Sequence, residues 1–230
     1  MTTAPPSPRA IAIVWLLYFL TAILGAVLTK GIVVSADAAA TANNILSHAS
    51  VYQAGIGLDL VSNLLYLALT ALLFGLFRSV NPNLALIAAV FGLVGGTVQI
   101  VGGLLRIAPP VILANHQLGT AFGTQQVQAA ALLSLTLYNT VFQISFVLFG
   151  SFMLFTGLLI LRSTFLPRWL GWWWVVAGTA ALIFLWPPLA TKFFPLILAA
   201  DTAELALLLW LLVKGVDTSK WRAQGGISAA

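Results

Sequence analysis

The 230-residue chain contains no cysteine. Disulfide bonds, thiolate nucleophiles and cysteine-ligated metal or iron–sulfur centres are therefore excluded together. Charge is also scarce, because only 7% of the residues are charged, against about 25% in a soluble globular domain. Only five residues are acidic, so the position of each acid is informative.

Motifs of several enzyme classes are absent as well. The chain has no His-Glu-x-x-His helix, no Gly-x-Ser-x-Gly elbow and no glycine-rich phosphate loop. Its two histidines, His48 and His116, lie in predicted loops, where a histidine is usually hydrated rather than bound to a metal. We therefore expect no metal, no cofactor and no ATP-driven activity, and an enzyme is less favoured than a non-enzyme.

Hydrophobic residues, in contrast, make up 61% of the chain. They form runs of about 20 residues, each long enough to cross a hydrocarbon core about 30 Å thick. This pattern predicts an all-α polytopic transmembrane bundle, a single integral membrane domain over residues 1–230. The six predicted spans cover about residues 11–29, 56–77, 84–105, 130–161, 169–186 and 193–213, and a polar tail follows over residues 216–230.

Basic residues are distributed unevenly between the two sides of this predicted bundle. Seven lie on the side of the termini and three on the other side, so the positive-inside rule places both termini in the cytoplasm. The seven are Arg9, Arg78, Arg162, Arg168, Lys214, Lys220 and Arg222, and the three are Lys30, Arg106 and Lys192. Although the net charge is +5, these residues form no basic patch, so we expect membrane lipids and no nucleic acid as partners.

The glycines and tryptophans of the predicted spans have structural interpretations. Gly92 and Gly96 form a Gly-xxx-Gly spacing, which predicts close helix packing, either within one chain or between two copies in a homo-oligomer. The tryptophans at the ends of the fifth span form an aromatic interface belt. Pro109 and Pro110 are expected to end the third span, and the polar segment 115–128 is expected to be a surface loop or a lid.

Several segments in order along the chain resemble one known family. They are Ser35-Ala-Asp-Ala38, Asp59-Leu-Val61, Arg78-Ser-Val-Asn-Pro-Asn83, Phe165-Leu-Pro-Arg-Trp-Leu-Gly171 and Glu204-Leu-Ala-Leu-Leu-Leu-Trp-Leu-Leu-Val-Lys-Gly215. The sequence thus resembles a bacterial membrane family catalogued as domain of unknown function 4386. The resemblance implies a six-helix protein of the bacterial cytoplasmic (inner) membrane, in which Asp59 and Glu204 occupy family positions. It implies no activity.

Two acids, Asp201 and Glu204, lie one helical turn apart inside the sixth apolar run. A charged side chain at the bilayer centre costs roughly 2.5–3.5 kcal/mol on insertion scales, and such residues mark pathways or binding sites by default. Other spans carry polar residues at helical spacing, so we predict one outward-facing pocket in the outer half of the bundle. Its predicted lining is Glu204, Asp201, Asp59, Asn63, Gln99, Arg106, Asn139 and Gln143.

These residues leave three functional hypotheses and one structural alternative. The leading hypothesis is a protein that binds or transports a small molecule or ion, with Glu204 and Asp201 as proton- or cation-responsive groups. The second is an intramembrane enzyme that acts on a lipid or isoprenoid, with the two acids as general acid and base. The third is a non-catalytic membrane partner or envelope sensor. In the structural alternative, Arg106 or Lys192 pairs with an acid and the cluster only fixes helix packing.

Overall fold

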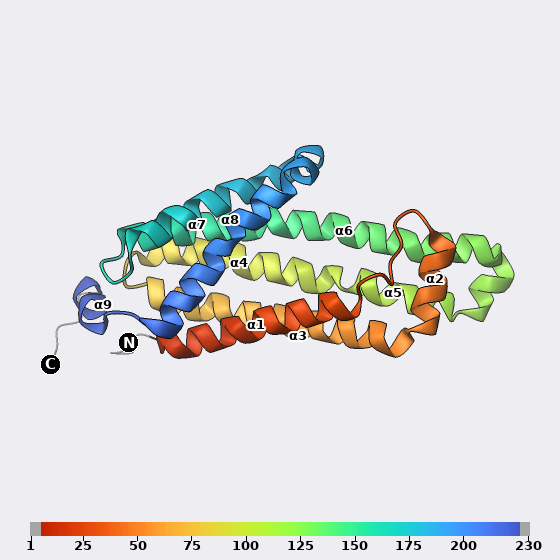
Figure 1. Ribbon diagram of the computed structural model, residues 1–230, viewed down its shortest axis with the longest axis horizontal. Coiled ribbons are helices and arrows are strands. Elements are labelled where there is room, and N and C mark those ends of the chain that lie inside the picture. Colours follow the sequence, from red (N-terminus) through yellow and green to blue (C-terminus); the bar gives the residue numbers. More distant parts are fainter. Residues whose placement is uncertain (1–5, 226–230) are drawn as a thin grey trace. The chain divides into compact units, whose positions relative to one another are not determined.

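The computed structural model describes residues 6–225, and this part of the chain is helical without any strand. It contains six helices long and apolar enough to cross a membrane, which confirms the predicted all-α fold with six spans. The six cover Pro8–Leu28, Ala49–Phe77, Pro82–Leu113, His116–Arg162, Arg168–Leu185 and Pro188–Val213. Figure 1 follows them in the colours of the sequence.

The contacts divide the chain into two units, which are described separately. Within the described residues, the first unit consists of residues 6–17, 65–97 and 143–225. The second consists of residues 18–64 and 98–142. Four of the long helices, α1 (Pro8–Leu28), α3 (Ala49–Phe77), α4 (Pro82–Gly102) and α6 (His116–Arg162), contribute to both.

In the first unit, α7 (Arg168–Ala181) and α8 (Pro187–Val213) form an antiparallel pair joined by the 3₁₀ turn η1 (Leu182–Leu185) (Figure 1). Trp174 of α7 is fully buried and donates its indole N–H to the backbone carbonyl of Ala203 on α8, at 3.0 Å. Its ring also packs edge-on against Trp15 of α1, with centroids 5.7 Å apart. These aromatic contacts fix α8, and with it the two acids of that helix, against α1 and α7.

Glycines allow α6 and α7 to approach each other at backbone distance. Gly150 and Gly157 on α6 face Gly178 and Gly171 on α7, and both pairs are spaced by seven residues, or two helical turns. A Cβ atom on Gly178 would lie 2.4 Å from the backbone nitrogen of Leu154, closer than real Cβ atoms approach. Small residues therefore form this interface, as is typical where helices pack inside a membrane.

The glycines of α4 pack within the chain in the same way. A Cβ on Gly92 would lie 2.8 Å from the Cγ2 of Thr70, and one on Gly96 would lie 2.6 Å from the Cδ2 of Leu67. The Gly-xxx-Gly face is therefore covered by α3 of the same chain.

The second unit contains a surface helix that the apolar runs do not predict, α2 (Ala38–Ser47). Asp37 caps it by accepting a hydrogen bond from the backbone N–H of Ala40 at 2.8 Å, because the first amides of a helix lack partners within it. Ile45 on the inner side of α2 packs with Ile32, Tyr52 and Leu135 in a buried cluster. The long segment 30–54 is thus largely ordered helix rather than loop.

The third span does not end at its two prolines, which corrects the expectation from the sequence. After a break at Gly103 the chain continues as α5 (Leu104–Leu113), which contains both Pro109 and Pro110. Proline has no N–H, so the carbonyl of Arg106, four residues before Pro110, has no helical donor. The phenol O–H of Tyr52 donates to this carbonyl instead, at 2.9 Å.

The segment 115–128 is also helical, contrary to the loop or lid expected there. Asn115 caps α6 by accepting from the N–H groups of Gln117 and Leu118, at 3.0 and 3.2 Å. The helix then bends at Gly123, which has φ 69° and ψ 160°. Only glycine adopts that backbone conformation readily, so the first turns of α6 change direction there before the long apolar part of the helix begins.

Candidate functional site

A cavity of about 60 Å³, lined by both polar and apolar residues, lies in the second unit, between α3, α4, α5 and α6. Its lining is Ile56, Asp59, Leu60, Asn63, Gln99, Ile100, Gly103, Arg106, Ile107 and Tyr138. A cavity needs roughly 10–15 Å³ by the same measure to hold one water molecule. This one therefore has room for several waters, an ion or a ligand of a few non-hydrogen atoms.

An ion pair between Asp59 of α3 and Arg106 of α5 forms one wall of the cavity. The side chains are mostly buried, with 26% of Asp59 and 15% of Arg106 exposed. The guanidinium carbon also lies 5.3 Å from the ring centroid of Tyr138, a cation–π distance. The charge of Asp59 therefore has a partner, as the structural alternative requires. The ion pair also places a strong dipole beside the cavity.

Gln99 of α4, a residue of the cavity lining, has a buried hydrogen-bond acceptor without a donor among the described residues. The side chain is only 7% exposed, and its Nε2 donates to the hydroxyl of Tyr138 at 3.1 Å. Its carbonyl oxygen Oε1 is buried and receives no hydrogen bond from the described residues. Because a buried acceptor without a donor costs about 1–3 kcal/mol, a donor that reached Oε1 from the cavity would be bound favourably.

The neighbouring polar groups complete a mixed lining. Asn63 donates from Nδ2 to the backbone carbonyl of Asp59, at 2.8 Å, which leaves its own amide oxygen as a further acceptor. The hydroxyl of Tyr138 accepts from Gln99 and retains its hydrogen as a donor. The cavity lining can therefore both donate and accept hydrogen bonds, and it contains an ion pair.

The two acids of α8 belong to the first unit, and neither is among the residues that line this cavity. Asp201 and Glu204 are partly buried, and neither forms an ion pair with a lysine or arginine of residues 6–225. The buried indole nitrogen of Trp15 lies next to the carboxyl group of Glu204. Lys192, the basic residue of α8 proposed above as a partner, lies over the ring of Phe193 instead.

The structure thus brings together four of the eight predicted site residues. Asp59, Asn63, Gln99 and Arg106 line one cavity, whereas Asn139 is exposed and lies outside the lining, as does Gln143. On α6 the cavity residue is Tyr138, next to Asn139, because the polar face of that helix segment is turned outward there. Helical spacing identified which residues share a face but not which neighbour that face meets.

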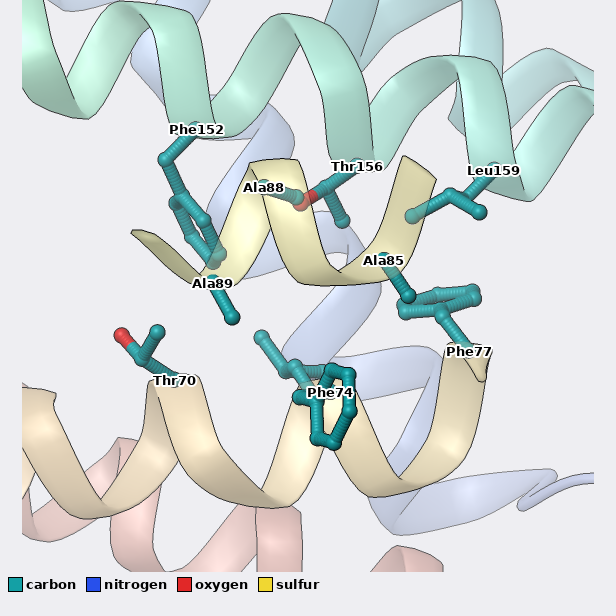
Figure 2. Close-up of a pocket in the computed structure, with 10 residues that line it drawn as sticks. Thr70, Phe74, Phe77, Ala85, Ala88, Ala89, Phe152, Thr156 and Leu159 are labelled. Atoms are coloured by element: carbon teal, nitrogen blue, oxygen red, sulfur yellow. The ribbon is translucent and has the colours of Figure 1, made fainter. Parts of the chain in front are cut away.

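A second void, in the first unit, has a different character. Figure 2 shows it between α3, α4 and α6, with Phe74, Ala88 and Phe152 pointing into it. Its volume is about 10 Å³ and its lining is almost entirely apolar, so it is at the lower limit for a single water molecule. It is a packing defect rather than a binding site.

Six apolar spans and a polar cavity among helices define a polytopic helical membrane protein. The model of the family described as "Domain of unknown function (DUF4386)" matches residues 11–215, so the chain belongs to that family. Comparisons with curated proteins and with solved structures give no significant match. The family membership covers every residue discussed above in the cavity and both acids of α8.

Proposed function

We propose that this protein binds a small molecule or ion in the cavity of the second unit and carries it across the membrane. The observation that carries the proposal is the buried Oε1 of Gln99, an acceptor without a donor beside the Asp59–Arg106 pair. Buried polar atoms in proteins are almost always satisfied by protein or by water, so an unsatisfied one on a residue of the cavity lining favours an occupant whose donor reaches it after a small movement of the side chain.

The chemistry of the lining limits the class of ligand. Gln99 and Asn63 offer amide oxygens and Tyr138 offers a hydroxyl hydrogen, while Arg106 and Asp59 offer both signs of charge. A polar solute of a few non-hydrogen atoms with at least one N–H or O–H donor fits these groups. A long apolar chain does not, because the cavity is too small for it and the buried amide oxygen of Gln99 would stay without a donor.

The acids of α8 support a role for protons in the transport step. A carboxylate without a cationic partner is costly inside a bilayer, and its proton is the cheapest means of removing the charge. Asp201 and Glu204 have no ion pair among the described residues. We therefore propose that Glu204, and Asp201 beside it, take up and release protons during transport.

We also propose an orientation in the bacterial cytoplasmic membrane with both termini in the cytoplasm. Seven of the ten basic residues lie on the side of the termini, which is the support for this orientation. In that orientation Arg106 lies toward the outer face, and we propose that the cavity opens to that side.

Uptake into proteoliposomes tests the function. A mixture of small polar solutes is added outside at acidic pH, with the interior buffered near neutrality, and the contents are analysed by mass spectrometry. We expect at least one solute to accumulate, and Gln99→Leu to reduce its uptake about tenfold, because one hydrogen bond is worth about 1–1.5 kcal/mol. Glu204→Gln should remove the dependence on the pH gradient.

Asp37→Asn is the matched control for the loss of an acid. Asp37 caps α2, and asparagine caps a helix about as well as aspartate, so this variant should transport normally. The proposal fails if no solute accumulates above empty liposomes, or if uptake is equally strong in wild type, Gln99→Leu and Glu204→Gln.

A further inference from the structure

A second polar cleft, of about 440 Å³, lies at the end of the first unit where α8 leaves the apolar region. Its walls are the connection between α6 and α7, residues 164–167, and the segment that follows α8, residues 214–217, together with Trp210 and Lys220. No residue of the proposed transport site is among them. The cleft therefore needs its own explanation.

The helix α9 (Thr218–Gln224) gives this cleft a fixed wall, although the sequence predicted only a polar tail there. Trp221 of α9 is 2% exposed and donates its indole N–H to the backbone carbonyl of Leu76 at 2.8 Å. Gln224 accepts from the backbone N–H of Thr164 at 2.9 Å and donates to the carbonyl of Arg162 at 2.8 Å. These bonds hold α9 against the ends of α3 and α6.

The position of the cleft relative to the spans places it at the level of lipid headgroups. Lys214 directly follows Val213, the last residue of one span. The connection 164–167 lies between Arg162, the end of a second span, and Arg168, the start of a third. A side chain in the cleft is therefore just outside the hydrocarbon, where lysines and arginines meet lipid phosphates.

The walls combine cationic and apolar groups. Lys214 and Lys220 supply two ammonium groups, and Trp210, Phe165 and Leu166 supply an apolar surface. Asp217 is the single acid of the lining, 3.6 Å from the amine of Lys220, and its carboxylate also accepts from the hydroxyl of Ser219 at 2.6 Å. The net charge of the described lining is therefore positive. The lining also has an apolar surface that can contact the upper part of an acyl chain.

We propose that this cleft binds the phosphate headgroup of an anionic membrane phospholipid. Lys214 and Lys220 contact the phosphate, and the acyl chains leave along Trp210 and Phe165 into the bilayer. Basic pockets between transmembrane helices at the membrane surface recognise anionic headgroups in this manner. A soluble phosphate compound would use the two lysines but not the apolar wall.

Native mass spectrometry of the full-length protein in detergent tests this proposal, with phosphatidylglycerol as the probe and phosphatidylcholine as the neutral comparison. We expect tighter binding of phosphatidylglycerol by wild type. The double variant Lys214→Gln/Lys220→Gln should weaken it roughly thirtyfold, about fivefold for each lysine near an anionic headgroup. Neither lysine side chain takes part in the hydrogen bonds that hold α9, and the backbone N–H of residue 220 remains in the variant, so the variant should fold.

Two controls separate this site from general electrostatics. Lys30→Gln/Lys192→Gln removes the same charge from exposed lysines outside the cleft and should leave phosphatidylglycerol binding unchanged. Asp217→Asn keeps the cap of α9 and removes the acid that competes for Lys220, so it should tighten phosphatidylglycerol binding a few-fold.

Three results would overturn the proposal. The first is equal phosphatidylglycerol binding by wild type and the Lys214→Gln/Lys220→Gln variant, and the second is an equal loss in the Lys30→Gln/Lys192→Gln control. The third is displacement of the lipid by millimolar inorganic phosphate, which would identify a soluble phosphate compound as the ligand. None of these measurements depends on transport. The lipid site and the proposed transport function can therefore be refuted independently of each other.

Discussion

The phenol O–H of Tyr52 donates a hydrogen bond to the backbone carbonyl oxygen of Arg106, 2.9 Å away. This carbonyl is available because Pro110, one helical turn later, has no N–H to offer it. The side chain of the same arginine pairs with Asp59 in the wall of the cavity. A buried tyrosine thus holds the backbone of the residue whose guanidinium group forms part of the proposed binding site.

The Tyr52→Phe variant should destabilise the protein by about 1–2 kcal/mol, since it leaves a buried carbonyl without a donor. Denaturant unfolding in detergent measures the change. In a Pro110→Ala background the new N–H of residue 110 can bond to the Arg106 carbonyl, so Tyr52→Phe should cost less than half as much. Equal costs in the two backgrounds would show that the proline does not create the need for Tyr52.

The close approach of α6 and α7 predicts a large effect from a single methyl group. Gly178→Ala places a Cβ 2.4 Å from a backbone nitrogen that cannot move aside independently, so it should destabilise by about 1–3 kcal/mol. Gly57→Ala is the control, because a Cβ there meets nothing within 4 Å. In that helix interior alanine should stabilise by about 0.5–1 kcal/mol. Similar thermal stabilities of the two variants would contradict the packing described here.

The docking of α9 depends on one aromatic side chain. Trp221→Ala should detach α9 without unfolding the rest, because a seven-residue helix has little stability without its tertiary contacts. Trypsin cleavage after Lys220 and Arg222 measures detachment and should become much faster than in wild type. Trp172→Ala, at a position 62% exposed on α7, should leave cleavage unchanged. Slow cleavage of Trp221→Ala would contradict the docked arrangement.

The start of α9 should depend on pH. The hydrogen bond from Ser219, followed by that from the backbone of Lys220, lowers the pKa of Asp217 below its ordinary value. The stabilisation by this carboxylate is therefore present above the ordinary aspartate pKa, near 4, and is lost as the pH falls toward the lower pKa of the folded state. Hydrogen exchange of residues 218–224 should show wild type losing protection in this range, whereas Asp217→Asn should not. If wild type and Asp217→Asn lost protection equally as the pH falls, the Asp217 carboxylate would not be the cause.

The apolar runs predicted the six spans because the length of a hydrophobic run is itself the physical requirement for crossing a bilayer. The helices outside those runs were missed, although their start signals are present in the sequence. Asp37 and Asp217 each cap a short helix, but α2 and α9 are held by tertiary contacts such as those of Ile45 and Trp221. Such contacts have no local signature.

The site was predictable in part, because polar residues at helical spacing lie on one face of a helix. Spacing placed Asp59 and Asn63 on one face of α3, and Gln99 and Arg106 in the third span, and these four do line one cavity. Spacing did not reveal that Asn139 is turned outward and that Tyr138 takes its place. Nor did it show that the acids of α8 are not part of the cavity lining, because the neighbours of a helix are set by the fold and not by its own periodicity.

The absence of cysteine permits a direct test of the central claim, that the cavity beside Gln99 is a hydrated site for a polar ligand. Asn63→Cys and Leu64→Cys place single thiols at adjacent positions of α3, one in the cavity lining and one at a residue 53% exposed on the apolar surface. Both are treated in membranes with a positively charged methanethiosulfonate, which reacts with the thiolate and does not enter hydrocarbon. Asn63→Cys should react about tenfold faster or more, from the outer side of the membrane. Equal, slow labelling of both variants from either side would mean a dry cavity and would contradict the account.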